Sequence, residues 1–167
     1  EGLISADEAL LRVDANRLEE LFKRVISSGA GASSIAKGLN ASPGAASGKV
    51  VFSADEAEGW ANRGEKVILV RRETSPEDIG GMHAAQGILT ALGGMTSHAA
   101  VVARGMGKCC VAGAGSVRID VARGRFTTDG GAGARVARGD VISLDGSSGE
   151  VMLGAVATVS PAMSKDF

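Results

Sequence analysis

One short stretch of the sequence, residues 93–105, combines side chains that could perform group-transfer chemistry. It contains two glycines, the adjacent hydroxyls of Thr96 and Ser97, and His98, one of only two histidines in the chain. An apolar run follows, as expected if a helix begins at Thr96 or Ser97. The first amides of a helix lack intrahelical partners and lie at the positive end of the helix dipole, so they bind anions. The stretch therefore predicts an anion site beside a histidine.

The residue types in this stretch suggest a role for each member. Gly93 and Gly94 would let the backbone approach an anion closely, and the two hydroxyls could donate to it. The positive end of the helix disfavours imidazolium, which leaves His98 as a neutral, nucleophilic ring. Because a histidine nitrogen can form a covalent intermediate, a phosphoryl group on His98 would lie against these donors. We therefore predict that His98 is catalytic and that phosphate is bound by Gly93, Gly94, Thr96 and Ser97.

The charges around this stretch are compatible with an anionic ligand. No Asp or Glu occurs from Ile79 to Ile119, whereas Arg104, Lys108 and Arg118 all lie in this segment. Simple burial of the segment would also explain the missing acids. Arg104 could bind phosphate across a domain interface, or it could complement the negative end of the helix.

Other chemistries fit the same residues less well. Ser97 and His98 resemble a hydrolase pair, but neighbours on a helix point about 100° apart, and the G-x-S-x-G motif is absent. A metal site built from Cys109, Cys110, His83 and His98 lacks the spacing that holds zinc. No lysine completes a nucleotide-binding P-loop. We expect His83 to be structural and both cysteines to lie buried in a strand, and a histidine at a helix start can itself be an ordinary capping or core residue.

Capping patterns and apolar runs predict the elements that must position these residues. Capping boxes begin helices at Ser5 and Ser53, and Ser75 followed by Pro76 begins a third. The order of the elements predicts an α/β fold in which parallel or mixed strands are crossed over by helices. Strands are expected within 44–53, 66–71, 87–92 and 108–114, a helix at 98–106, and a hairpin at 141–154.

The composition changes along the chain and suggests a division into parts. Residues 5–26 have the spacing of an amphipathic helix, and 27–37 are mostly Ser, Gly and Ala, as in a flexible linker. We expect residues 1–37 to be a helical segment with a linker, 38–154 the compact domain, and 155–167 a C-terminal linker. The chain begins without Met, which suggests a piece of a larger protein.

The overall composition excludes several functional classes. The chain of 167 residues is 44% hydrophobic and 22% charged with a net charge of −1, so neither nucleic acid nor a membrane is an expected partner. No apolar run approaches the roughly 18 residues of a membrane span, and no secretory or other targeting segment is recognisable. Two adjacent cysteines do not make a disulfide framework. We expect the cytoplasm or a reducing organelle lumen.

The stretch 87–113 resembles the phosphohistidine signature of the enzymes that use phosphoenolpyruvate, and particularly that of the pyruvate phosphate dikinase family. Segments 1–13, 39–52, 68–90 and 139–151 match the dikinase pattern in the same order. Phosphoenolpyruvate synthases and enzyme I of the sugar phosphotransferase system usually have Arg at the position of Met95 and an Ile-Pro-Ala run at 108–111, so both differences favour the dikinases. One departure is Leu92, near which the family often has a charged residue.

The resemblance implies a central swivelling domain of β/β/α fold between an N-terminal ATP-grasp domain and a C-terminal pyruvate/phosphoenolpyruvate barrel. It implies that His98, at Nε2, accepts the β-phosphoryl group of ATP, with release of AMP and, after phosphate enters, pyrophosphate. His98 then passes the group to pyruvate to make phosphoenolpyruvate. Thr96 matches the threonine that some plant members phosphorylate to inactivate the enzyme, although we favour a plain N-cap role for this residue.

The same resemblance sets expectations for cofactors and partners. The domain would bind no cofactor or metal of its own, Mg²⁺ would be held by the other domains, and the full enzyme would be a homo-oligomer. An isolated domain would not turn over by itself. Two alternatives stay open: a phosphohistidine domain of a phosphoenolpyruvate synthase or an enzyme I-like protein, and an inert swivelling module used only as a structural spacer.

Overall fold

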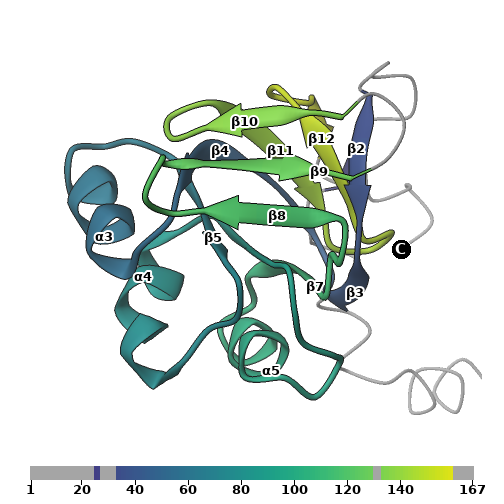
Figure 1. Ribbon diagram of the computed structural model, residues 1–167. Helices are drawn as coiled ribbons and strands as arrows, with labels where there is room; N and C mark the ends of the chain where they lie inside the picture. Colours follow the sequence, from purple (N-terminus) through teal and green to yellow (C-terminus); the bar gives the residue numbers. More distant parts are fainter. Residues whose placement is uncertain (1–24, 27–32, 130–132, 160–167) are drawn as a thin grey trace, which may run out of the picture.

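The fold is built around one large, mixed β-sheet (Figure 1). The computed structural model describes residues 25–26, 33–129 and 133–159. The large sheet has eight strands in the order β2-β12-β11-β4-β5-β6-β7-β3. They are β2 (Ser34–Lys37), β3 (Leu39–Ser42), β4 (Ala45–Val51), β5 (Val67–Arg71), β6 (Gly87–Thr90), β7 (Cys109–Ala112), β11 (Val141–Asp145) and β12 (Glu150–Leu153).

Strands β4 to β7 run parallel to one another, and helices connect them. These helices are α3 (Ala54–Asn62), the 3₁₀ turn η1 (Pro76–Asp78) continuing into α4 (Ile79–Ala84), and α5 (His98–Gly105). The expected α/β fold with helical crossovers is therefore confirmed. The strands and helices predicted between residues 44 and 114, and the hairpin of β11 and β12, lie close to their expected ranges.

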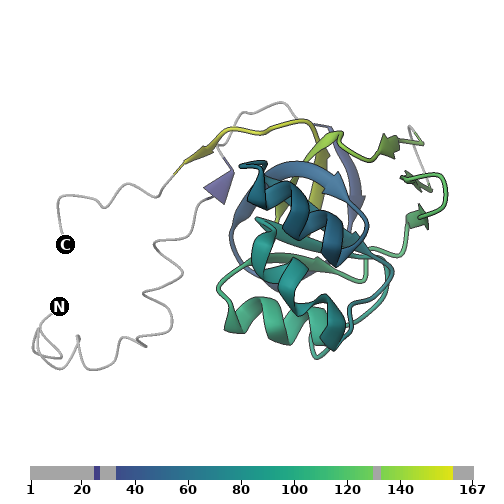
Figure 2. The ribbon, with the colours of Figure 1, turned by 90° about the vertical axis from the view of Figure 1, so that its left-hand side faces the viewer.

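A small antiparallel sheet covers one face of the large sheet, and the helices cover the other (Figures 1 and 2). The small sheet consists of β8 (Val117–Asp120), β9 (Arg125–Thr128) and β10 (Arg135–Ala137). These layers give the β/β/α architecture that the resemblance implies. No pattern in the sequence predicted β8, β9 and β10.

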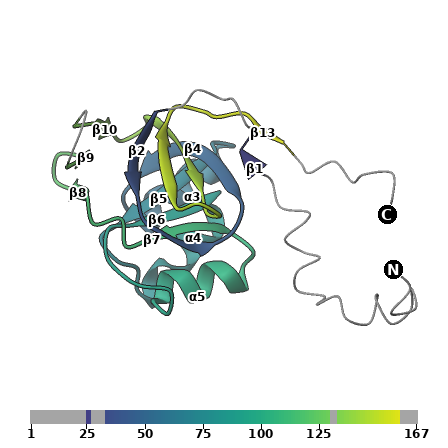
Figure 3. The same cartoon turned by 90° about the vertical axis from the view of Figure 1, so that its right-hand side faces the viewer.

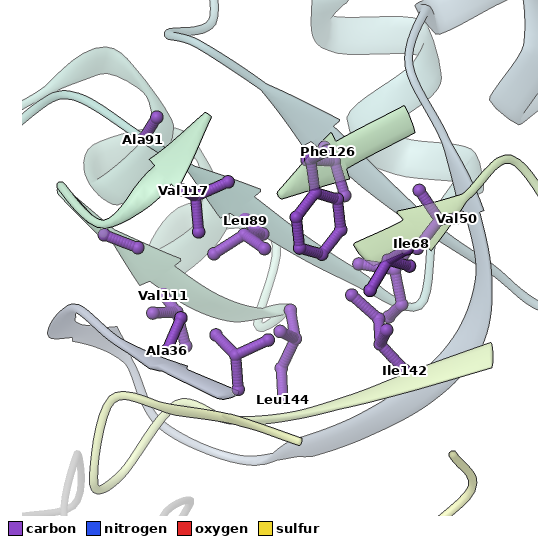
Figure 4. Packing of buried hydrophobic residues seen from close by; sticks show 14 of the residues in the cluster. Ala36, Val50, Ile68, Leu89, Ala91, Val111, Val117, Phe126, Ile142 and Leu144 are labelled. Carbon is purple, nitrogen blue, oxygen red and sulfur yellow. The ribbon is translucent and has the colours of Figure 1, made fainter. Parts of the chain in front are cut away.

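Each face of the large sheet has its own core, because alternate residues of a strand point to opposite faces. Between the two sheets, Phe126 packs among aliphatic side chains such as Val50, Ile68 and Ile142 (Figure 4). On the helical face, Leu69 and Ile88 pack beneath the alanines of α5. Ala99, Ala100 and Ala103 are buried there. Small side chains let α5 lie close to the sheet and hold its first residue near the strand ends.

The large sheet closes on itself at Gly38. Strands β2 and β3 lie at opposite ends of the strand order, yet Gly38 alone separates them in the chain. Its amide donates to the Gly149 carbonyl at 2.8 Å. A Cβ at Gly38 would lie 2.7 Å from the Ala112 carbonyl oxygen, so the closure requires glycine.

The boundaries expected for the flanking parts need correction. Val25–Ile26, expected to end a helix, form strand β1 instead, and Ser34–Lys37, expected in a linker, form β2 of the large sheet. Thr158–Val159, expected in the C-terminal linker, form β13, which pairs antiparallel with β1 beside the main body (Figure 3). Strands this short are fixed by their partners and leave no periodic pattern. The rest of the expected helix and of both linkers lies outside the described residues.

Candidate functional site

His98 lies where the carboxyl ends of two neighbouring parallel strands meet. It is the first residue of α5, which follows β6 through the loop 91–97. This loop continues the pairing with the end of β5, since the Ala91 amide donates to the Arg71 carbonyl at 3.1 Å and the Leu92 amide to the Arg72 carbonyl at 2.8 Å. Loops at the carboxyl ends of parallel strands are the usual place for a ligand in an open α/β sheet.

Ser97 is the N-cap of α5, so of the two predicted helix starts, Thr96 and Ser97, the second is confirmed. Its backbone is extended, and its hydroxyl accepts from the Ala100 amide at 3.4 Å. Thr96 lies outside the helix and is exposed, so the N-cap role that we favoured for Thr96 is wrong. The amides of the first helical turn still point out of the helix start, which is the geometry of an anion site.

The two glycines of the loop differ in what the backbone requires. Gly93 has a φ of 107°, and a Cβ there would lie 2.9 Å from the Ser97 Cβ. Gly113, which follows β7, packs so closely that its Cβ would lie 2.4 Å from the Gly93 carbonyl oxygen. A Cβ at Gly94 would meet nothing within 4 Å. Gly93 is thus needed to shape the loop, and phosphate binding by either glycine stays a prediction.

The imidazole of His98 is half-buried and has a partner that sequence reasoning missed. Its Nδ1 lies 3.0 Å from Oγ1 of Thr74, a side chain only 8% exposed. The two residues are 24 positions apart. The signal that could have found Thr74 is topological: it follows β5 as His98 follows β6, and these strands are parallel neighbours.

Of the three cations in the acid-free segment, only Arg104 reaches the loop before His98. Its Nη2 donates to the Met95 carbonyl at 2.5 Å, so the side chain reaches back towards the helix start. Lys108 donates instead to the His83 and Ala85 carbonyls at 2.6 Å each, and Arg118 pairs with Asp129 at 2.7 Å. Burial lowers the pKa of Lys108. Phosphate binding by Arg104 remains a prediction.

The loop that supplies Thr74 also brings carboxylates that the acid-free segment lacks. Glu73 and Glu77 flank Thr74 in the sequence and are exposed. A hydrogen bond from the Ser75 hydroxyl lowers the pKa of Glu77. The loop that carries Thr74 therefore adds exposed carboxylates that the segment 79–119 lacks.

The remaining candidate residues lie apart from this site. His83 is exposed near the end of α4, and Cys109 and Cys110 are buried in β7, as expected. Burial raises the pKa of the Cys110 thiol to about 12, an effect that the positive charge of Arg104 only partly opposes. Within the part of the chain that the structure describes, no three His, Cys, Asp or Glu side chains cluster as metal ligands. None of its helices is long and apolar enough to span a membrane.

Comparisons with known proteins match both the whole chain and its central part. The chain is 54% identical to "Pyruvate, phosphate dikinase" of Rhizobium meliloti (strain 1021) over 167 residues, covering 100% of this chain and 18% of the relative. It is 51% identical to "Pyruvate, phosphate dikinase 1, chloroplastic" of Arabidopsis thaliana, covering 100% and 17%, and 51% identical to "Pyruvate, phosphate dikinase" of Clostridium symbiosum, covering 100% and 19%. The chain thus spans less than a fifth of the length of these relatives.

A solved structure and a family profile complete the comparison. The NMR solution structure of an Enzyme I protein (nEIt) is 28% identical, with a TM-score of 0.38, over 54% of this chain and 31% of that one. The profile described as "PEP-utilising enzyme, mobile domain" matches residues 63–149, which is more than half of the chain and includes the whole site around His98. The chain therefore belongs to the family of PEP-utilising enzyme mobile domains.

Proposed function

We propose that this chain is the phosphocarrier domain of a pyruvate phosphate dikinase and that His98 is the residue that becomes phosphorylated. The observation behind the proposal is the position of the imidazole: it is accessible at the start of α5, and its Nδ1 contacts the Thr74 hydroxyl at 3.0 Å. With Nδ1 engaged, Nε2 is the nitrogen left for chemistry. The identity of 54% to a dikinase over the whole chain supports the choice of reaction.

The proposed chemistry requires one tautomer of His98, and the contact with Thr74 accommodates it. A neutral imidazole has one N–H and one lone pair, and the bond made by one nitrogen determines which is which. In the proposed state the proton is on Nδ1 and donates to Thr74 Oγ1, which leaves the lone pair on Nε2. When Nε2 bonds to phosphorus, the proton stays on Nδ1. The resulting cationic ring is a good leaving group when the phosphoryl group moves on.

Electrostatic stabilisation of the phosphoryl group would come from the start of α5. Phosphoryl transfer depends mainly on positioning and on neutralising charge on the equatorial oxygens. The amides of His98 and Ala99 are the first of the helix and have no intrahelical acceptor. The Thr96 hydroxyl is exposed beside them, and Ser97, whose oxygen caps the Ala100 amide, retains its own proton to donate. Arg104, bound to the Met95 carbonyl, adds positive charge at the same loop.

In the complete reaction, His98 would serve two neighbouring domains in turn. Nε2 attacks the β-phosphorus of ATP, and the bond from that phosphorus to the oxygen of AMP breaks. Inorganic phosphate then takes the γ-phosphoryl group to give pyrophosphate, which leaves the β-phosphoryl group on His98. The enolate oxygen of pyruvate finally attacks this phosphorus, the N–P bond breaks, and phosphoenolpyruvate forms. The proposed full enzyme also contains the ATP-grasp domain and the pyruvate/phosphoenolpyruvate barrel, and these domains hold Mg²⁺. We propose that it is a homo-oligomer in the cytoplasm or in another reducing compartment.

The test of this function is a chimera in which these 167 residues replace the matching segment of the Rhizobium meliloti dikinase. Incubation with ATP, Mg²⁺ and phosphate should add the mass of one phosphoryl group to the peptide containing His98. The modification should be lost in acid, as expected of an N–P bond. When pyruvate is added, the phosphoryl group should be transferred to it. A peptide that gains no mass would exclude the proposal. If AMP formed from ATP with water in place of phosphate as the co-substrate, the domain would belong to a synthase. If a protein accepted the phosphoryl group, the domain would belong to an enzyme I-like relay.

Thr74 should matter for rate more than for substrate binding. In the chimera, Thr74→Val should lower kcat about 10- to 100-fold, because small misplacement of a reacting group has effects of this size. The KM for pyruvate should stay unchanged, since Thr74 is only 8% exposed and its hydroxyl contacts the ring of His98. Thr74→Ser keeps the hydroxyl and should restore most of the rate. Equal rates for the valine variant and the parent chimera would remove Thr74 from the mechanism.

The regulatory role of Thr96 stays part of the proposal. Thr96 is exposed two residues before His98, so a kinase could reach its hydroxyl. A phosphate there would add about two negative charges close to the ring and repel an incoming phosphoryl dianion. This agrees with the inactivation that the resemblance implies for some plant members.

A further inference from the structure

A buried carboxylate stabilises the loop that places Thr74 next to His98. Asp78, the last residue of η1, is only 4% exposed. Its Oδ2 accepts from the Ser75 amide at 3.0 Å and lies 3.4 Å from the Ser75 hydroxyl. Asp78 therefore closes the turn that begins directly after Thr74.

Arg71 connects this carboxylate to the large sheet. Its Nε lies 3.3 Å from Oδ1 of Asp78, and its Nη1 donates to the Phe52 carbonyl at 3.1 Å. The Nε atom is buried and makes no hydrogen bond among the described residues, so the Asp78 carboxylate supplies its compensating charge. Because Phe52 follows β4 and Arg71 ends β5, the guanidinium fixes the turn to the ends of two strands.

Phe52 is held through its amide as well as through its carbonyl. Its amide donates to Oε2 of Glu56 at 2.9 Å, and Oε1 of Glu56 lies 2.8 Å from Nε of Arg138. Phe52 is therefore held through both of its backbone polar groups, the amide by Glu56 and the carbonyl by Arg71. Arg71 therefore holds the turn 75–78 in a fixed position relative to the large sheet.

We propose that the Arg71–Asp78 ion pair is a positioning pair for His98: it fixes the turn 75–78 and thereby holds the Thr74 hydroxyl at Nδ1. The contacts form a continuous path from Phe52 through Arg71, Asp78 and Ser75 to the residue next in sequence, Thr74. Its catalytic consequence rests on the proposed function. Its effect on the imidazole itself does not, since the ring is oriented whether or not it is phosphorylated.

The Arg71–Asp78 ion pair can be tested because one substitution removes its ionic contact and leaves the hydrogen bond within the turn 75–78 intact. An amide at position 78 can still accept from the Ser75 amide, so the local turn survives Asp78→Asn. The charge opposite Arg71 is lost, and its buried Nε is left without a compensating partner, which is unfavourable. The turn then detaches from the sheet, and Thr74 no longer has a fixed position against the ring. Asp129→Asn is the matched control, because it breaks the Arg118–Asp129 pair, which is exposed and belongs to the small sheet.

The test is the tautomer of His98, observed by ¹⁵N NMR of the imidazole nitrogens in the 167-residue chain. The parent chain and Asp129→Asn should show the proton on Nδ1. Asp78→Asn should shift the population towards Nε2–H, the form favoured by a free imidazole. His83, exposed and distant, serves as the internal reference in the same spectrum. Circular dichroism establishes that each variant is folded, and Arg71→Lys, which keeps the charge but cannot hold both partners, replaces Asp78→Asn if that variant unfolds.

Two outcomes would overturn the inference. One is an Nε2–H tautomer in the parent chain, and the other is an unchanged tautomer in folded Asp78→Asn and Arg71→Lys. In the chimera, Asp78→Asn should also lower kcat about tenfold while the KM for pyruvate stays unchanged. If His98 of the parent is never phosphorylated, the proposed function fails but the tautomer experiment still decides the positioning role.

Discussion

Replacing His98 by asparagine in the dikinase chimera should abolish the formation of phosphoenolpyruvate from ATP, phosphate and pyruvate. Asparagine retains a polar group that can bond to Thr74 but has no nitrogen able to bond covalently to phosphorus. Removing the nucleophile of an enzyme typically lowers kcat by about 10⁴-fold or more. The residual rate should therefore fall below detection in a coupled assay of phosphoenolpyruvate.

His83→Asn is the matched control for this experiment. It removes the other histidine of the chain, whose side chain is exposed on α4 and whose carbonyl, unaffected by the change, accepts from Lys108. This variant should retain the full rate. If the His98 variant kept its activity, the domain would be the inert spacer of the structural alternative.

Replacing Phe126 by alanine should lower the free energy of unfolding by roughly 3–5 kcal/mol, the usual range for a buried phenylalanine. Phe126 is fully buried between the two sheets and is the largest side chain that the small sheet contributes to this core (Figure 4). Urea denaturation of the 167-residue chain measures the effect directly, and the melting temperature should fall by on the order of 10 °C.

Phe126→Leu provides the comparison, because it keeps most of the apolar volume and should have a smaller effect, about 1–2 kcal/mol. Near-equal losses for the two variants, each below about 1 kcal/mol, would mean that the small sheet does not seal the core. His98 lies on the opposite face of the large sheet, so any folded Phe126 variant should keep its phosphorylation.

The elements nearest the site could be predicted because their signals are local. Ser53 and Ser97 cap helices in the expected way, and the helix expected at Ser75 and Pro76 begins there as a 3₁₀ turn that continues into α4. The apolar runs of β5 and β6 are unbroken because both strands are buried on both faces. The position of His98 at the first residue of a helix followed from these signals alone.

What could not be predicted depends on contacts between distant segments. Nothing near residue 74 in the sequence indicates that Thr74 contacts His98, since the register of two parallel strands brings them together. Arg104 was expected to complement the end of its own helix or to bind phosphate, but its contact with the Met95 carbonyl depends on how the loop folds back. The small sheet escaped prediction because its strands have only three or four residues each, with charged residues on the outer face.

The antiparallel pairing of β1 with β13 means that the chain comes to the domain and departs from it through one narrow ribbon. Because β1 and β13 pair only with each other, we expect a rotation about this ribbon to leave the hydrogen bonds of the other two sheets intact. We expect the domain formed by the large and small sheets to rotate about this ribbon as one rigid unit. The distance that His98 moves would then depend on how far its imidazole lies from the ribbon.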